Sequence, residues 1–449
     1  MNLDYILKDN LLKVWTKFVS ASVVGVILNT IYTMVDGIFV GQGAGEAGLA
    51  GVNLAWPAVT IILGIGLLFG AGSSSLISIY MGQHDTDKAE RLLGTVLKSI
   101  LYTGIILMIL GFILADPMVK FLGATADTYQ YTKDYFLVIY LMAIPYLLAN
   151  ALNLLVRADG NPNLSMIMVG AGAIGNIILD WFFVINLGWG TKGAALATGA
   201  GVILSTIIGL WYFLSGRSHL KFKKEYFKID PLLLKDILKI GFVSFMIQLS
   251  IGVVILLQNK IIYLYGNTAD IAIFSVAGYT ISLYIQLSVG ISQGMQPLIG
   301  YHFGAHSIKR MRRLLQITLI VSIVIGILLL GCLISYGNYF IQLFGIADSL
   351  LPLAYKRTVI FCLGIPCIGI VYTMGAYYQS INRNIEANIV SLGRSFVLQI
   401  IFSLLLPIFI GVEGIFYAQP LSDIGSIFIL GLVILYSYIR NKKVRNNLT

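Results

Sequence analysis

The stretch GQHDTDKAERLL at residues 82–93 recurs 222 residues later as GAHSIKRMRRLL at residues 304–315. The same offset pairs Gly72 with Gly294, and further small residues match along the two halves. Self-similarity at a fixed offset indicates that one structural unit has been duplicated. We therefore expect a chain built from two related halves.

The composition places these halves in a membrane. Of the 449 residues, 58% are hydrophobic and only 11% are charged, whereas soluble domains usually carry about 25% charged residues. This composition excludes a soluble enzyme, a disordered chain and a nucleic-acid-binding domain. The net charge of +10 accordingly favours contact with anionic lipid headgroups.

A helix that crosses a bilayer needs roughly 20 mostly apolar residues. By that criterion the chain resolves into about twelve spans with mostly short connections, which predicts an all-α polytopic membrane protein. The expected spans are 14–40, 49–80, 92–115, 133–157, 163–186, 192–215, 237–263, 271–302, 313–336, 352–380, 386–410 and 414–439.

The basic residues indicate the orientation, because short cytoplasmic loops collect Lys and Arg. With both termini inside, 24 of the 30 basic residues fall on the cytoplasmic side. The others, on the outer side, are Lys120, Lys133, Lys192, Lys260, Lys356 and Arg357. We expect a multi-pass protein of the cell membrane with both termini in the cytoplasm.

Six spans in each repeat mean that both copies insert the same way up. The halves should therefore be related by a pseudo-two-fold axis along the membrane normal. We expect an N-lobe at residues 1–215, a cytoplasmic linker at 216–235 and a C-lobe at 236–449. Two such lobes leave a cleft near the membrane midplane, where parallel-repeat transporters hold their substrates.

Three acidic residues lie deep inside expected spans, namely Asp36, Asp180 and Asp423. A charge at the bilayer centre costs at least about 2.5–3.5 kcal/mol, so each is a candidate for function. Asp36 and Asp180 fall at similar depth in the outer half of the N-lobe. Two close carboxylates in a low dielectric compete to hold one proton.

Further oxygen-bearing groups are expected beside these two acids. Asn176 and Asp180 are four residues apart and share a helix face, as do Ala194 and Thr198. With Asp36 they offer carboxylate, amide, hydroxyl and carbonyl oxygens, which suit a proton or Na⁺ rather than a transition metal. The alternative is that Asp180 only hydrogen-bonds a neighbouring helix.

The second half lacks this arrangement, since the repeat offset places Gln258 at the position of Asp36. Asp423 is the only deep acid of the C-lobe. Two interpretations stay open for Asp423. It forms a second-lobe cation site with Gln258, or it is a satisfied partner of Gln258, Gln399 or Arg394.

Several motifs resemble the multidrug and toxic compound extrusion (MATE) family, nearest its MepA-like bacterial branch. The first span carries VDGIFVG at 35–41, the fifth GNIILD at 175–180 and the sixth GAALAT at 193–198. The loops MGQ at 81–83 and RADGNP at 157–162 and the six-plus-six layout are also similar. The resemblance covers essentially the whole chain.

This resemblance implies twelve helices in two bundles and export of amphipathic, often cationic, compounds in exchange for H⁺ or Na⁺. The family's N-lobe cation site maps onto Asp36, Asn176, Asp180 and Thr198, and the resemblance suggests the Ala194 carbonyl as a further ligand. A tyrosine of the fourth span often joins this site in the family. Tyr135 and Tyr140 are the candidates here, and we prefer Tyr135.

The chain departs from the family in two places. Many relatives have Pro fifteen residues before the first-span acid, where this chain has Ala21, so a Pro kink is not available to bend that helix. The seventh and tenth spans carry no acid, so a C-lobe cation site of the kind some relatives build there is not expected.

We therefore expect a secondary antiporter that works as a monomer among membrane lipids, without cofactor or nucleic acid. No Ser/His/Asp, CxxC, HExxH or Walker arrangement supports an enzyme or an ATP-driven pump. The alternative is a lipid-linked precursor flippase of the same superfamily, whose cleft should be basic to hold pyrophosphate. Only Lys260 and Arg394 lie near the expected cleft.

Overall fold

The computed structural model describes residues 4–342, 344 and 348–446, and within them every regular element is a helix. The N-terminal half consists of α1 (Asp4–Lys8), α2 (Leu11–Gly82), α3 (Thr86–Phe121), α4 (Tyr129–Leu141), α5 (Ala143–Ala158), α6 (Pro162–Asp180), the π-helix η1 (Trp181–Asn186) and α7 (Gly190–Leu214). The short 3-10 helix η2 (Lys224–Tyr226) follows.

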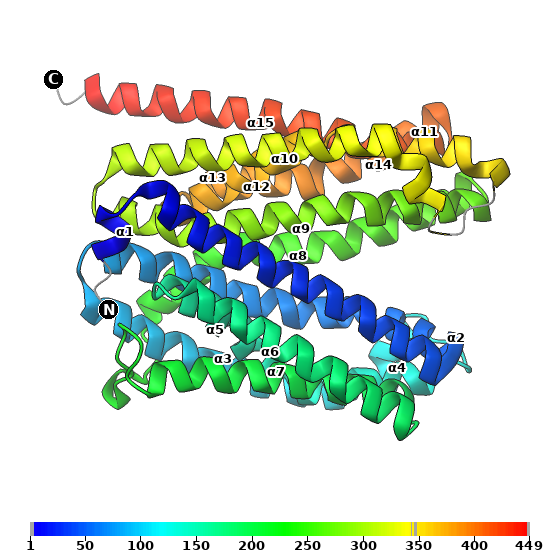
Figure 1. The fold of residues 1–449 in the computed structure, drawn as a ribbon, viewed down its shortest axis with the longest axis horizontal. Helices are drawn as coiled ribbons and strands as arrows, with labels where there is room; N and C mark the ends of the chain where they lie inside the picture. The colour runs from blue at the N-terminus through cyan, green and yellow to red at the C-terminus, as the bar shows by residue number, and fades with distance from the viewer. Residues whose placement is uncertain (1–3, 343, 345–347, 447–449) are drawn as a thin grey trace. The chain divides into compact units, whose positions relative to one another are not determined.

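The C-terminal half consists of α8 (Pro231–Tyr265), α9 (Thr268–Gly304), α10 (Ile308–Gln342), η3 (Asp348–Leu350), α11 (Leu351–Cys362), α12 (Ile365–Ser380), α13 (Asn384–Leu392), the π-helix η4 (Gly393–Leu398), α14 (Gln399–Ile410) and α15 (Glu413–Asn446). Figure 1 shows long helices throughout the chain. The prediction of an all-α membrane protein is confirmed.

Ten of the described helical stretches are long and apolar enough to cross a membrane. There are eleven when α4 and α5, bent by 59°, count as one span. As one straight helix the 72 residues of α2 would measure roughly 108 Å, more than three times the hydrocarbon core of about 30 Å. Because α2 therefore supplies two spans, the total agrees with the expected number of about twelve.

The loop expected between the first two spans is reduced to a single residue. Gly45 alone leaves the helical conformation inside α2, with φ 66° and ψ −166°. Glycine adopts such a positive φ readily, whereas other residues are strained there. The chain reverses at this point, and the dark-blue first part of α2 and its lighter-blue second part run in opposite directions in Figure 1.

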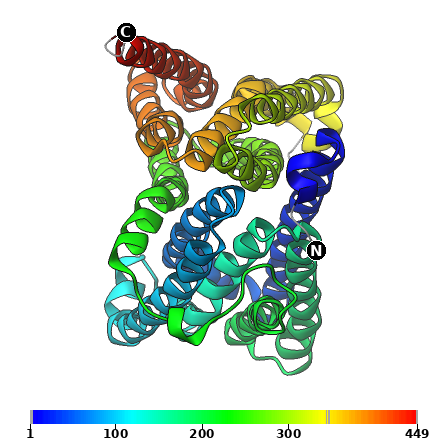
Figure 2. The same cartoon turned by 90° about the vertical axis from the view of Figure 1, so that its left-hand side faces the viewer.

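Contacts divide the chain into two compact units. The first unit comprises Met1–Leu249 and Gln296–Met311, and the second comprises Ser250–Met295 and Arg312–Thr449. Helices α8, α9 and α10 therefore each contribute to both units. Figure 2 shows many of the helices nearly end-on. The expected division into an N-lobe, a linker and a C-lobe stays a prediction.

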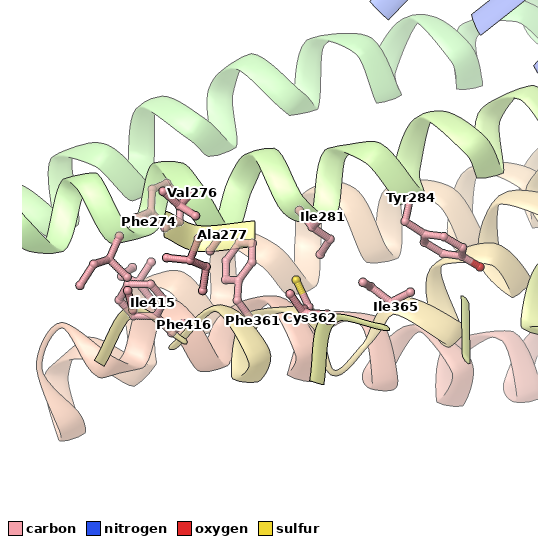
Figure 3. Close-up of a cluster of buried hydrophobic side chains, with 14 of the residues drawn as sticks. Phe274, Val276, Ala277, Ile281, Tyr284, Phe361, Cys362, Ile365, Ile415 and Phe416 are labelled. Atoms are coloured by element: carbon pink, nitrogen blue, oxygen red, sulfur yellow. The ribbon is translucent and has the colours of Figure 1, made fainter. Parts of the chain in front are cut away.

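The core of the second unit is apolar and aromatic. Phe274 of α9, Phe361 of α11 and Phe416 of α15 pack edge to face, with ring centroids 5.6–6.4 Å apart, and Figure 3 shows them in one cluster. Each such pair adds about 0.5–1.5 kcal/mol to the stabilisation from burial. In the same unit the buried Arg357 guanidinium pairs with Asp270, which fixes α11 against the start of α9.

A buried carboxylate holds the loop between α5 and α6 in the first unit. Asp159 is fully buried. It accepts hydrogen bonds from the hydroxyls of Tyr212 (2.6 Å) and Ser218 (2.9 Å) and from the backbone N–H groups of His219 (3.0 Å) and Leu220 (3.2 Å). Charge-assisted hydrogen bonds of this kind stabilise a buried anion. We call this end of the first unit the Asp159 end.

The segment that follows α7 is fastened to α3 at the Asp159 end. Glu90 of α3 is buried, accepts the backbone N–H of Lys221 at 3.0 Å and pairs with the Lys223 ammonium at 2.7 Å. Helix α8 then begins at Pro231, before the expected end of the linker. The Asp230 side chain caps it by accepting two backbone N–H groups at 2.9 and 3.2 Å, as helix N-caps commonly do.

We expect Asp159→Asn to destabilise the Asp159 end, because the amide nitrogen would face donors rather than accept from them. Each buried donor that loses its acceptor costs about 1–3 kcal/mol. The melting temperature of the purified protein in detergent should fall by a few degrees. The matched variant Asp127→Asn, at an exposed position, should leave it unchanged, and equal melting temperatures for the two variants would contradict this role.

Candidate cation site

The candidate site lies in the first unit, where α6 and α7 touch backbone to backbone. A Cβ added at Gly201 would lie 2.5 Å from the carbonyl oxygen of Gly172, and one added at Gly172 would lie 2.9 Å from that of Gly201. Small residues allow such close approach between membrane helices. The approach brings Asn176 of α6 to Thr198 of α7, where the amide Nδ2 donates to Oγ1 at 3.3 Å.

The threonine continues this hydrogen-bonded chain. The Thr198 hydroxyl donates to the carbonyl oxygen of Ala194 at 2.9 Å. All three residues are buried. Within the described residues no donor reaches Oδ1 of Asn176. The structure therefore brings together three of the residues expected at the site and leaves the asparagine oxygen available.

Asp36 of α2 and Asp180, the last residue of α6, complete the arrangement. Asp36 is 9% exposed and Asp180 is fully buried. Their carboxyl groups are neighbours that interact electrostatically. Two ionised carboxylates at close range in a medium of low dielectric constant repel each other, which favours a proton or another cation between them. Among the residues that the structure describes, no hydrogen-bond partner reaches Oδ1 of Asp36 or either oxygen of Asp180.

The contact between α2 and η1 explains why these acids meet. A Cβ added at Gly43 of α2 would lie 2.4 Å from a methyl carbon of Val184 and 2.9 Å from its carbonyl oxygen. The π-helical turns of η1 directly follow Asp180, and such turns often mark functional sites. Because Gly43 is two helical turns beyond Asp36, this contact holds the first part of α2 beside the end of α6.

The resulting site is rich in oxygen and poor in counter-charge. Four buried oxygens lack donors within the described part of the chain, namely Asp36 Oδ1, Asn176 Oδ1 and both carboxylate oxygens of Asp180. Neither acid takes part in an ion pair between described residues. No cluster of three or more His, Cys, Asp or Glu residues is found there that could hold a metal ion. Hard oxygen donors of this kind suit H⁺ or Na⁺.

Of the two tyrosines considered, Tyr135 is the one beside the acids. It is 2% exposed and interacts electrostatically with both carboxyl groups. Tyr140 stacks on Phe136 with ring centroids 4.3 Å apart and donates its hydroxyl to the carbonyl oxygen of Ala58 at 3.2 Å. The hydroxyl of Tyr140 is therefore engaged elsewhere.

Two further tyrosines near the site were missed by the sequence analysis. Tyr32 of α2 and Tyr146 of α5 both lie within electrostatic range of Asp36 and Asp180. Tyr32 precedes Asp36 by four residues on the same helix, and this i, i+4 spacing is a signal that could have found it. Tyr146 carries no such signal, because it comes close only through the packing of α5.

The two candidates in the second unit have different partners. The Gln258 amide donates to the hydroxyl of Ser403 at 3.1 Å. Asp423 is fully buried, pairs with the Arg394 guanidinium at 2.7 Å and accepts from the amide of Gln419. The structure therefore joins Asp423 to Arg394, one of the partners considered. None of the hydrogen bonds between described side chains joins it to Gln258.

This ion pair occupies positions that glycines occupy in the first half. The repeat offset of 222 relates Arg394 to Gly172 and Asp423 to Gly201. The first half thus has a backbone contact between two helices where the second half has a buried ion pair. Pairing compensates much of the cost of burying both charges. The buried acid Asp423 of the second half is therefore neutralised by an arginine, whereas Asp36 and Asp180 of the first half have no such partner among the described residues.

The fold defines a helical membrane protein built from two related halves, an architecture found in parallel-repeat transporters. The MatE family model matches residues 21–182 and 240–405, most of the chain. The chain belongs to the multidrug and toxic compound extrusion (MATE) family. This membership confirms the resemblance, and it identifies a transporter family rather than an enzyme family.

Several known proteins are similar along their whole length. The multidrug export protein MepA of Staphylococcus haemolyticus (strain JCSC1435) is 25% identical over 447 residues, which cover 100% of this chain and 97% of MepA. The crystal structure of MATE in complex with MaL6 has a TM-score of 0.92 at 20% identity and covers 98% of this chain and 100% of that one. An outward-facing multidrug resistance MATE family transporter has a TM-score of 0.91 at 20% identity, with 99% coverage of each chain.

We expect Gly201→Ala to disable the site while keeping all its polar groups. The added Cβ would push α7 away from the Gly172 carbonyl and lengthen the hydrogen bond from Asn176. Transport of a fluorescent organic cation by cells should fall at least about ten-fold, the equivalent of about 1.4 kcal/mol.

The matched control is Gly170→Ala on α6, whose Cβ would meet only a terminal carbon of Leu28 at 3.4 Å. It should retain most of the transport at equal amounts of protein in the membrane. Equal transport by the Gly170→Ala and Gly201→Ala variants would show that the close approach of α6 and α7 does not matter.

Proposed function

We propose that this protein is a secondary antiporter that exports amphipathic organic cations in exchange for H⁺ or Na⁺. The observation that carries the proposal is the buried pair Asp36 and Asp180, which has no donor or counter-ion among the described residues. Membership of the MATE family and the multidrug export named for the relative MepA support the export of drugs.

The two acids provide the coupling step in this proposal. When both are ionised and the site is empty, the carboxylates repel each other in a medium of low dielectric constant. A proton or Na⁺ between them removes the repulsion and draws the first part of α2 towards α6 and η1. Exchange follows because the cation binds one packing of α2 more tightly than the other, and the organic cation has the opposite preference.

The remaining residues fit supporting roles in the same site. Either acid can carry a proton, whereas Na⁺ would add the amide oxygen of Asn176 and the hydroxyl of Thr198 as ligands. The Ala194 carbonyl already accepts from that hydroxyl, so it orients Thr198 and is available as a more distant ligand. We assign to Tyr135 the role of donating its hydroxyl to a carboxylate when the cation leaves.

The second-lobe site at Asp423 and Gln258 stays a prediction. A proton on Asp423 would have to compete with the Arg394 guanidinium at 2.7 Å. The same ion pair weakens the flippase alternative, because it neutralises one of the two basic groups expected near the cleft. No further observation favours a site for pyrophosphate.

The proposal also includes an orientation. The Asp159 end carries basic residues such as Arg157, Lys221 and Lys223, and basic loops face the cytoplasm. We therefore place the Asp159 end and both termini in the cytoplasm, in a monomer surrounded by the lipids of the cell membrane.

We expect Asp36→Asn to abolish exchange, because an amide cannot take up and release a proton and is a weaker ligand for Na⁺. The measurement uses purified protein in liposomes, with imposed pH or Na⁺ gradients and ethidium as the fluorescent cation. Movement driven by a pH gradient alone indicates H⁺ coupling, and movement driven by a Na⁺ gradient alone indicates Na⁺ coupling.

Glu46→Gln is the matched control, because Glu46 is an exposed acid on the same helix α2. This variant should transport like the unmodified protein. Ethidium transport by Asp36→Asn at the unmodified rate would overturn the assignment of the coupling site.

A further inference from the structure

In the first unit, the start of α3 is covered by the segment that follows α7. Besides the contacts of Glu90 described above, Asp87 accepts a hydrogen bond from the hydroxyl of Tyr226. The Thr95 hydroxyl donates to a backbone carbonyl oxygen of the segment at 3.1 Å. A Cβ added at Gly94 would collide with the carbonyl oxygen of Tyr226. Two acids, a hydroxyl and a glycine therefore let this segment lie along one face of α3.

The matching face of α10 has none of these features. At the repeat offset of 222, the two acids, the glycine and the threonine correspond to Lys309, Arg312, Gln316 and Ile317. A similar segment cannot dock there, because bases replace the acids that accept from it. A long side chain also replaces the glycine that lets the backbone approach. This face of α10 has therefore diverged from a surface for a protein segment to a basic surface.

The end of the chain does not supply a counter-charge for this face. Helix α7 ends at Leu214 and the chain then turns back, whereas α15 continues to Asn446, well beyond the matching position. No acidic residue follows Asp423 in the sequence. Arg312 and Gln316 are exposed in the structure. The basic face of α10 is thus accessible where its counterpart on α3 is covered.

Three arginines gather at this end of the second unit. Arg312 and Arg313 are exposed at the start of α10, and Arg383 lies between α12 and α13. Arg312 and Arg383 are both within electrostatic range of the Tyr377 hydroxyl of α12. None of the ion pairs between described residues includes any of the three arginines. Their positive charge is therefore available to an anion.

Beyond the arginines, the same face of α10 is apolar. Ile320, Val324 and Ile327 follow at helical spacing, and all three are exposed. On α3 the residues that match the last two, Tyr102 and Ile105, are exposed as well. Apolar side chains exposed on a membrane-spanning helix suit contact with acyl chains. A basic helix end that continues into an exposed apolar face is complementary to a phospholipid with an anionic headgroup.

We propose that the start of α10 in the second unit binds the headgroup of an anionic phospholipid, on the face that corresponds to the covered face of α3. Arg312 and Arg313 hold the phosphate, because guanidinium groups donate paired hydrogen bonds to phosphate oxygens. Arg383 adds charge, Tyr377 adds a hydroxyl donor, and the acyl chains lie along α10. In the proposed orientation this lipid belongs to the cytoplasmic leaflet, and its binding does not depend on the proposed antiport.

The test measures lipid binding to the purified full-length protein by native mass spectrometry. The probe is dioleoylphosphatidylglycerol. Dioleoylphosphatidylcholine has the same acyl chains and a phosphate but no net charge, so it is the matched lipid. We expect the tightest phosphatidylglycerol to bind at least about ten-fold more tightly than phosphatidylcholine, because the site is basic. Equal affinities for the two lipids would overturn the proposal.

The double variant Arg312→Gln, Arg313→Gln should lower the affinity for phosphatidylglycerol at least about ten-fold, because each basic residue near the headgroup adds to the attraction. The matched control is Lys235→Gln with Lys239→Gln, at two exposed basic residues of α8. It removes the same charge and should keep the affinity. Equal losses in the two double variants would show that only net charge attracts the lipid, and would overturn the site.

Gln316→Glu covers the case in which the arginine variant does not fold, because it keeps all three arginines. The new carboxylate would repel the headgroup and would pair with Arg312 or Arg313, which lie four and three residues before it. Its affinity for phosphatidylglycerol should therefore fall, and an unchanged affinity would contradict the proposal.

A last arm separates a lipid from a soluble anion. Inorganic phosphate at millimolar concentration should leave phosphatidylglycerol bound to the unmodified protein, because it lacks the acyl chains. Displacement of the lipid by inorganic phosphate would show a site for a soluble anion and would overturn the lipid assignment. None of these measurements involves transport. Loss of ethidium exchange by the unmodified protein would therefore contradict the proposed function and leave the lipid site standing.

Discussion

A carboxyl group that is buried away from water needs a donor, a counter-ion or a proton, because an unpaired buried charge is very costly. Six acidic residues are buried in the described part of this chain, and four of them are satisfied from within the protein. Asp159 accepts hydrogen bonds from hydroxyl and backbone donors. Each of the other three is paired with a basic side chain: Glu90 with Lys223, Asp270 with Arg357 and Asp423 with Arg394. Asp36 and Asp180 face each other with no such partner there. In the proposed transport cycle, the H⁺ or Na⁺ that is exchanged supplies the positive charge that these two acids lack.

The two repeats have diverged at matching positions in a way that fits this division. In the first half, Gly172 and Gly201 let α6 and α7 touch, and the site lies about one turn away, at Asn176 and Thr198. In the second half, Arg394 and Asp423 stand at those positions and neutralise each other. A cation built into the chain cannot be exchanged. The asymmetry supports the proposal that cations are exchanged in the first unit.

Much of the architecture could be predicted from the sequence, because hydropathy, the duplicated stretch and helical spacing are local signals. The i, i+4 spacing of Asn176 and Asp180 survives in the structure because it depends on one helix only. The sequence predicted a reversal between the first two spans but not that Gly45 alone makes it. It named three possible partners for Asp423 but could not choose Arg394 among them, because that choice depends on contacts between helices. The same holds for Tyr146, which reaches the acids only through the packing of α5.

If Asp36 and Asp180 hold a cation that the organic substrate displaces, then binding of the substrate must release that cation. The release can be measured with a pH-indicator dye when tetraphenylphosphonium is added to the purified protein in weakly buffered, Na⁺-free detergent solution. We expect release of about one proton per bound substrate, as linkage between the two sites requires, and no release when both acids are replaced by asparagine. Equal release by the unmodified protein and the double variant would contradict it, as would binding without any release by the unmodified protein.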